Sequence, residues 1–160
     1  MLIILEGIVM CFVLLITCVV ATANGAVGGV ALYEEDVQKR AVALGLTTEK
    51  RIRKTMTAIS AALFIPLFTL VPLMVYGVNQ TQGFWSGFWQ MSAIMWIMGL
   101  FDRLFIDWYW VGNTRAWQIP GTEDLKPYIP RKVVLRKWIF TVAGFPMIAA
   151  LIAGVVELIL

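Results

Sequence analysis

The sequence predicts an all-α membrane protein, a bundle of four transmembrane helices with both termini outside the cell. Three observations support this prediction. Of 160 residues, 60% are hydrophobic and only 14% are charged, whereas about 25% are charged in a typical soluble domain. Four apolar stretches are long enough to cross a bilayer, and every lysine and arginine lies in or beside two of the segments that connect them. A globular core would not shelter so much apolar surface from water, so lipid is the expected solvent.

Each apolar stretch covers the roughly 30 Å hydrocarbon core of a bilayer at about 1.5 Å per residue. We expect a single membrane domain, residues 1–160, with spans at about 3–33, 56–78, 84–110 and 138–160. Prolines in the second and fourth stretches predict kinks there. The first stretch carries Glu6 and no positive charge near its start. We therefore expect it to be retained rather than cleaved as a signal peptide.

The positive charges set the expected orientation. Six lie between the first two stretches, in a loop at about 34–55, and seven lie at the end of the third stretch or in a loop at about 111–137, which accounts for all 13 lysines and arginines. Cytoplasmic loops carry the excess of positive charge, so both loops are predicted to face the cytoplasm and both termini the outside of the cell membrane. The cluster before the fourth stretch also suits anionic lipid headgroups and consists of Arg131, Lys132, Arg136 and Lys137.

The first loop contains signals for short helices. Glu35 and Lys39, and likewise Asp36 and Arg40, are spaced as i,i+4 pairs that favour a helical extension. Thr48 is the expected N-cap of the helix that follows.

Three ionisable residues, Asp102, Arg103 and Asp107, precede or adjoin Trp108 at the end of the third stretch. If Trp108 marks the inner interface, Asp102 and Arg103 lie inside it, where an unpaired charge costs a few kcal/mol. These residues predict a polar site that faces the cytoplasm and binds a cation or a charged solute. The alternative is a salt-bridge clasp between two helices.

The partners within this group follow from helical spacing. Arg103 and Asp107 are spaced to pair on an α-helix, whereas Asp102 points elsewhere. We expect Asp102 to pair with Arg53 or Lys54 at the start of the second stretch.

The loop after the third stretch mixes polar residues, among them Asn113, with residues of a buried type. Trp117 and Ile119 predict that this loop folds back on the bundle. Glu123 and Asp124, together with the two aspartates above, would complete an acidic cluster for a hard divalent cation such as Mg²⁺. The alternative is a packed connector in which these acids only cap short turns.

Two further carboxylates, Glu6 and Glu157, lie near the outer ends of the first and fourth stretches, where no lysine or arginine is available. If the two helices adjoin, one carboxyl stays protonated or the pair holds a cation, which would suit ion coupling. The alternative is that both carboxylates reach the water of the outer headgroup region.

The runs Asp107–Trp110 (D-W-Y-W) and Ile119–Asp124 (I-P-G-T-E-D) resemble a signature of a family of small bacterial multi-pass membrane proteins. The resemblance covers the end of the third stretch and the loop after it. It implies membrane helices and a bacterial source, and it implies no activity.

The sequence predicts binding rather than catalysis. The chain has no histidine, which excludes Ser-His-Asp, Cys-His and His-ligated zinc chemistry. We expect no cofactor and no nucleic-acid partner. The sequence identifies no catalytic residue. The expected function is binding of a small charged solute or lipid headgroup, in a transporter or a transporter component.

Two alternatives to this function stay open: a lipid-modifying enzyme with an acidic metal site, and a non-catalytic accessory subunit of a membrane complex. The expected partners are the lipid bilayer and anionic headgroups. Because four helices enclose little room, we also expect a homo-oligomer or a larger membrane complex.

Overall fold

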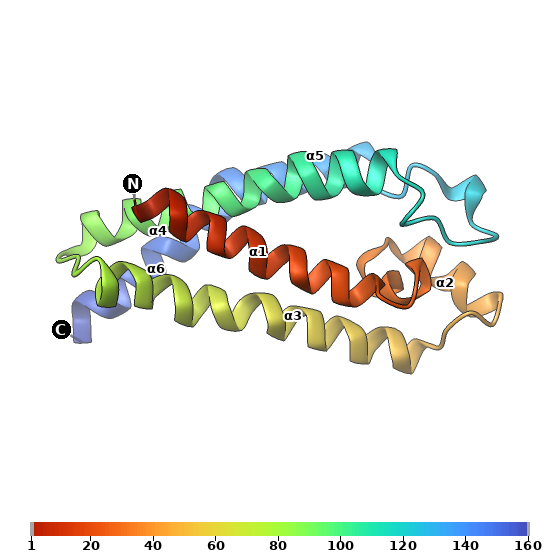
Figure 1. The fold of residues 1–160 in the computed structure, drawn as a ribbon, viewed down its shortest axis with the longest axis horizontal. Coiled ribbons are helices and arrows are strands. Elements are labelled where there is room, and N and C mark those ends of the chain that lie inside the picture. The colour runs from red at the N-terminus through yellow and green to blue at the C-terminus, as the bar shows by residue number, and fades with distance from the viewer. Residues whose placement is uncertain (1, 160) are drawn as a thin grey trace.

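The computed structural model describes residues 2–159, and within this range every regular element is a helix and no strand occurs. Long helical rods run side by side, and short helices cover one end of the bundle (Figure 1). The elements in chain order are α1 (Leu2–Thr22), η1 (Ala26–Leu32), α2 (Glu35–Ala43), α3 (Glu49–Pro72), η2 (Leu73–Val78), α4 (Phe84–Phe101), η3 (Asp102–Val111), η4 (Glu123–Leu125), α5 (Arg131–Ile139), η5 (Phe140–Gly144) and α6 (Phe145–Ile159). Of the η elements, η1 and η4 are 3₁₀-helices and η2, η3 and η5 are π-helices.

The two ends of the bundle differ in what they contain. Both ends of the chain, and the loop between η2 and α4, lie at one end, which we call the termini end (Figure 1). The opposite end, which we call the loop end, contains η1, α2 and the segment 112–130 that joins η3 to α5.

Helix α4 is the centre of the packing, because it makes the most extensive helix contacts, with α1 on one side and α6 on the other. Two glycines allow these close approaches. A Cβ atom added to Gly7 would lie 2.8 Å from the Cβ of Ile97, and one added to Gly99 would lie 2.7 Å from side-chain atoms of Thr141 and Phe145. Helix α3 packs against the other side of α1.

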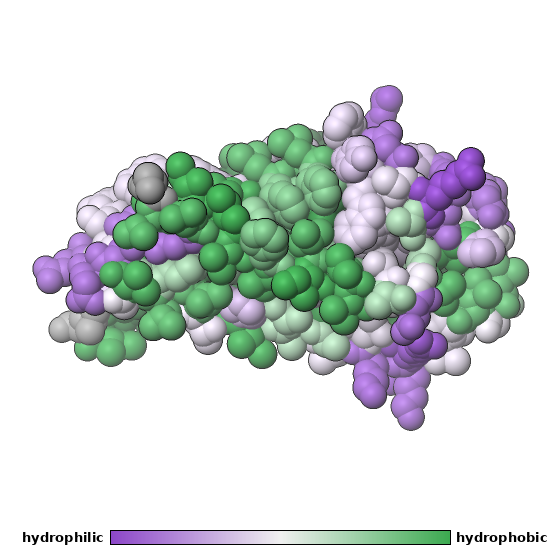
Figure 2. Space-filling model, in the orientation of Figure 1, coloured by the Kyte–Doolittle hydropathy of each residue, from purple (hydrophilic) through white to green (hydrophobic). Residues whose placement is uncertain are grey.

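Three helices in the described part of the chain are long and apolar enough to cross a membrane: α1, α3 continued by η2, and α5 continued through α6. The rod formed by α4 and η3 is not among them, because its tryptophans and Gln90 lower its mean hydropathy. Large apolar side chains are exposed along α1, α3 and α6. Figure 2 shows them as a broad hydrophobic zone over the middle of the bundle, with hydrophilic surface toward both ends.

Helical boundaries differ from the expected spans at several places. The first helix ends at Thr22, because Gly25 with φ of 85° turns the chain, and the 3₁₀-helix η1 follows. The second rod begins at Glu49, directly after the expected cap Thr48 and so before its expected span, whereas the fourth rod begins at Arg131, earlier than expected. Their π-helices η2 and η5 lie beside prolines, whose missing amide hydrogen interrupts the α-helical hydrogen-bond pattern.

The helical signals in the first loop are largely confirmed. Lys39 pairs with Glu35 at 2.6 Å, and the Thr48 hydroxyl accepts a hydrogen bond of 3.3 Å from the amide of Arg51 at the start of α3. Arg40 does not pair with Asp36 but reaches across to Asp124, 3.2 Å away. That contact fastens α2 to the segment 112–130.

Candidate functional site

The ionisable residues of η3 form a partly buried ionic cluster with one residue of α5. The two oxygens of Asp107 are divided between two cations: Oδ2 lies 2.9 Å from Nη1 of Arg103, and Oδ1 accepts a hydrogen bond of 2.8 Å from Nζ of Lys137. Arg103 also pairs with Asp102. The side chains of Arg103 and Asp107 are only 8% and 13% exposed. We call Asp102, Arg103, Asp107 and Lys137 the ionic cluster.

The π-helical geometry of η3 explains why both aspartates lie on the side of Arg103. Hydrogen bonds in a π-helix close over five residues rather than four, so residues five apart lie on the same side of the helix, whereas in an α-helix they do not. Asp102 and Asp107 are five apart and line the same small cavity. The expectation that Asp102 points elsewhere was therefore wrong, because it assumed an α-helix. Its expected partners Arg53 and Lys54 are exposed at the start of α3.

Sequence reasoning placed Lys137 in the basic cluster before the fourth stretch and did not identify it as a partner of Asp107. The two residues are 30 positions apart, and no local spacing connects them. The one available signal was that an aspartate in an apolar environment needs a positive charge nearby. Lys137 is the basic residue closest to the apolar part of the last rod.

A pocket of about 680 Å³ opens beside the ionic cluster at the loop end. We call it the loop pocket. Four of the predicted site residues line it: Arg103, Asp107, Trp108 and Asn113. The volume lies within the range of small-molecule sites, about 300–1,000 Å³.

Other residues of the loop pocket were not among the predicted ones. Gln118 and Lys126 come from the segment 112–130, and Trp138 comes from α5. Lys126 is exposed at the pocket and has no ion-pair partner among residues 2–159. The rim between η3 and α5 is apolar, with Leu104 and Val134 both exposed.

The segment 112–130 folds back on the bundle as predicted. Trp117 is 2% exposed and Ile119 is fully buried. The Tyr33 hydroxyl donates to the carbonyl oxygen of Trp117, and the Tyr33 ring lies edge-on to Tyr128, with centroids 5.2 Å apart. Burial, and then the neighbouring Tyr128, raise the pKa of Tyr33. Its phenol therefore stays protonated and keeps this donor in place.

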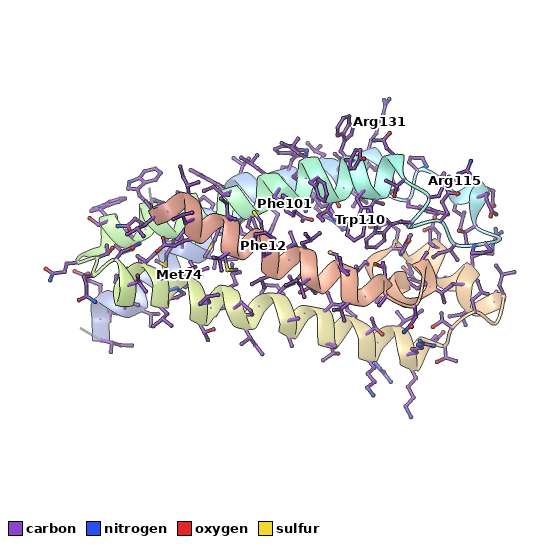
Figure 3. All side chains as sticks on the ribbon, viewed as in Figure 1. Phe12, Met74, Phe101, Trp110, Arg115 and Arg131 are labelled. Carbon is purple, nitrogen blue, oxygen red and sulfur yellow. The ribbon has the colours of Figure 1, made fainter. Side chains whose placement is uncertain are left out.

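Trp117 does not line the loop pocket. It borders a smaller cavity of about 130 Å³, the central cavity, which Asp102, Asp107 and Lys137 also line. Its indole edge packs against Trp110, with ring centroids 5.2 Å apart. Figure 3 shows Trp110 on the same rod as Phe101, closer to the loop end. Trp117 thus lies on the inner side of the site and does not line the open loop pocket.

The two remaining acidic residues of the loop lie away from the ionic cluster. Glu123 accepts a hydrogen bond of 3.2 Å from the amide of Gly121, and Asp124 pairs with Arg40 on α2. Within residues 2–159 no three acidic or cysteine side chains gather closely enough to hold a metal ion. The expected convergence of these acids with Asp102 and Asp107 does not occur: Glu123 is engaged within its own loop and Asp124 with α2.

An apolar groove of about 370 Å³ lies on the other side of Arg103 and toward the termini end. We call it the lateral groove. Its walls are apolar residues of α1, α3, η5 and α6, including Met10, Leu67 and Phe145. Asp102, Arg103, Arg136 and Lys137 stand at its charged end. Arg103 therefore separates the loop pocket from the lateral groove.

Glu6 and Glu157 do not form a pair. The helices that carry them, α1 and α6, each pack extensively on α4 and not on one another. Glu157 is exposed, as expected for a carboxylate that reaches water, whereas Glu6 is only 6% exposed. The alternative in which both carboxylates reach headgroup water therefore does not hold for Glu6, whose side chain turns toward Asn79 at the termini end.

The ionic cluster should contribute to folding. Asp107→Asn removes the charge shared by Arg103 and Lys137 and keeps the size of the side chain. We expect the free energy of unfolding to fall by about 2 kcal/mol or more, because a buried cation loses its partner. Asp124→Asn is the control: its side chain is 61% exposed, and we expect a loss below about 1 kcal/mol. Unfolding in detergent micelles measures both, and equal losses would contradict the assignment.

Comparison of the chain with models of protein families, with curated proteins and with solved structures gave no match. What the site binds is therefore inferred from its own residues.

Proposed function

We propose that the chain is a membrane protein with four spanning rods, both termini outside the cell and the loop end in the cytoplasm. The support is the distribution of charge on the folded molecule. All 13 lysines and arginines lie in the half of the bundle nearer the loop end, in α2, α3, η3, α5 or the segment 112–130. Arg115 and Arg131 both lie in this half, and Arg131 points away from the bundle (Figure 3). The rod α4–η3 lies alongside the three more apolar ones and would be the fourth span.

In this orientation the protein binds an anionic amphiphile at the cytoplasmic interface, with the headgroup in the loop pocket. The observation that supports this most directly is Lys126, a cation without an ion-pair partner in the described chain, which lines the same pocket as the buried Arg103. Amide groups of Asn113 and Gln118 on the same pocket supply neutral hydrogen-bond donors for headgroup oxygens.

The charge of the loop pocket favours an anion. Its charged residues are two cations, Arg103 and Lys126, and one carboxylate, Asp107. Both oxygens of Asp107 are already engaged with cations. A cationic ligand would find no unengaged carboxylate there, whereas an anionic group would compensate the charge of Lys126.

The position of the loop pocket favours an amphiphile over a small soluble anion. Leu104 and Val134 form an exposed apolar rim, and Trp108 and Trp138 also line the pocket. Tryptophan is enriched where lipid headgroups meet hydrocarbon. A ligand with an apolar tail would therefore keep the tail against this rim while the headgroup enters the pocket.

A transport role is a second candidate, supported by the lateral groove. Arg103 stands between the loop pocket and the groove, so a change in its pairing would connect a polar and an apolar compartment. The enzyme alternative has less support, because Glu123 and Asp124 are engaged away from the ionic cluster. An accessory subunit with a closed inner face also fits poorly with an open pocket of about 680 Å³.

The orientation is tested by labelling single cysteines in a background in which Cys11 and Cys18 are replaced by alanine. Ala116→Cys lies in the segment 112–130 and Gln82→Cys in the loop before α4, and both positions are exposed. In intact cells we expect an impermeant maleimide to label residue 82 only, and residue 116 only after permeabilisation. Labelling of residue 116 in intact cells would refute the orientation and remove the cytoplasmic site.

The ligand class is tested with Lys126→Gln. We expect phosphatidylglycerol to raise the unfolding temperature in micelles more than phosphatidylcholine does, since only the former carries net negative charge. One cation near a headgroup is worth about 1 kcal/mol, so the variant should bind phosphatidylglycerol about fivefold more weakly.

Lys50→Gln is the matched control for that experiment, because Lys50 is an exposed lysine at the start of α3 that does not line the loop pocket. It removes the same charge from the same half of the bundle. If both variants lose affinity equally, the preference reflects the general positive charge of the surface and the loop pocket is not the site. Equal stabilisation of the unmodified protein by both lipids would also contradict the proposal.

A further inference from the structure

Helix α3 and the last rod of the bundle, α5 through α6, leave an opening between them. Helix α3 packs on α1 and the last rod packs on α4, but α3 and the last rod do not pack extensively on one another. The lateral groove lies in this opening and is lined by Phe64 of α3 and Phe140 of η5, each 48% exposed. Both residues belong to rods that are apolar enough to cross a membrane. The groove therefore opens toward hydrocarbon rather than toward water.

The lateral groove is apolar along most of its length and charged at one end only. Core residues line it, among them Met10 and Leu67, which are 1% and 4% exposed. Its charged end is the one nearer the loop end of the bundle and is lined by Asp102, Arg103, Arg136 and Lys137. A ligand that fills the groove must therefore be amphiphilic, with an apolar tail along the core residues and a polar group at the charged end.

Arg136 gives the charged end its positive character. In the ionic cluster two aspartates balance Arg103 and Lys137, so Arg136 is the remaining cation. Its ion-pair partner Glu34 lies 3.8 Å away, and the side chain of Arg136 is 75% exposed. Such a long and exposed pair contributes little to stability. A phosphate can accept two parallel hydrogen bonds from a guanidinium group, so charge and geometry favour an anionic headgroup here.

The dimensions of the lateral groove fit one acyl chain. Phe145 at the apolar end follows Arg136 at the charged end by nine residues, which is roughly 13 Å of helix. This is close to the depth of one bilayer leaflet, half of the roughly 30 Å hydrocarbon core. A helix of a second chain, about 10 Å across, would occupy roughly 1,000 Å³ over that length, whereas the groove has about 370 Å³. An acyl chain is narrower than a helix and can enter.

We infer that the lateral groove binds one acyl chain of an anionic phospholipid and that Arg136 binds the phosphate of its headgroup. The loop pocket and the lateral groove share Arg103 alone, so this is a second lipid site beyond the one in the proposed function. It rests on the proposed function only for the orientation of the bundle, which assigns the bound lipid to the inner leaflet. A lipid in this position covers the opening between α3 and the last rod.

Photo-crosslinking of the full chain in phosphatidylcholine liposomes tests the site directly. The probe is phosphatidylglycerol with a diazirine in the middle of one acyl chain, and mass spectrometry locates its adducts after illumination. We expect adducts at Phe64 and Phe140 to be several times more abundant than at Ile65. Ile65 follows Phe64 on α3 and is 62% exposed, but it does not line the groove. Equal adducts at the three positions would show ordinary contact with the bilayer and overturn the inference.

The preference for an anionic headgroup is tested with the same diazirine on phosphatidylcholine. We expect this second probe to give fewer adducts at Phe64 and Phe140 than the phosphatidylglycerol probe, because its headgroup carries no net charge. Equally abundant adducts from the two probes would contradict an anionic ligand.

The role of Arg136 is tested with Arg136→Gln. Loss of one cation near a headgroup should reduce the adducts of the phosphatidylglycerol probe at Phe64 and Phe140 about fivefold at low probe concentration. Lys132→Gln is the matched control, because Lys132 is an exposed cation of the same helix that lines neither the lateral groove nor the loop pocket. Equal losses in the two variants, or no loss in Arg136→Gln, would refute the assignment of the phosphate to Arg136.

Lys126→Gln separates the lateral groove from the loop pocket. Lys126 lines the loop pocket and not the groove, so we expect the adducts at Phe64 and Phe140 to stay unchanged in this variant. A loss equal to that in Arg136→Gln would show one shared site and overturn the separate one. If the unmodified protein gives no excess of groove adducts while Lys126→Gln still weakens stabilisation by phosphatidylglycerol, the inference about the groove fails and the proposed function stands.

Discussion

The carboxylate of Asp107 joins two rods of the bundle, since one oxygen contacts Arg103 on its own helix and the other contacts Lys137 on α5. A buried cation such as Arg103 is tolerated only when it is paired. The pairing fixes η3 against α5, and these two elements provide the apolar rim and much of the wall of the loop pocket. The same contacts therefore hold the helices together and shape the site: they keep Arg103 between the loop pocket and the lateral groove.

Buried acidic residues have different partners at the two ends of the bundle. At the loop end the aspartates of η3 are compensated by Arg103 and Lys137, and aromatic residues of the segment 112–130 cover them. At the termini end Glu6 accepts a hydrogen bond from Asn79, and contacts with Gln90 and Thr81 extend this bond into a neutral network. The proposed anionic ligand therefore belongs to the loop end. Gly7 allows α1 to pack closely on α4, and Gly99 allows α4 to pack closely on η5 and α6.

The sequence was sufficient for features that depend on composition and local spacing. The all-helical fold, the Thr48 cap and the burial of Trp117 and Ile119 follow from such patterns and are observed. Features that depend on tertiary contacts did not follow. The π-helix of η3 changes the side on which Asp102 lies, and Lys137 reaches Asp107 only because α5 packs beside η3. Glu6 is buried by a loop that follows it by more than seventy residues.

A double-mutant cycle between Asp107 and Lys137 tests the central role of the ionic cluster most directly. The free energy of unfolding in micelles would be measured for Asp107→Asn, Lys137→Met and the double variant. Residues that interact directly show coupling energies of about 0.5–3 kcal/mol. We expect the double variant to lose about 1 kcal/mol less than the sum of the single losses, because the second substitution removes a charge that the first left unpaired. Additive losses would show that Asp107 and Lys137 do not hold η3 and α5 together.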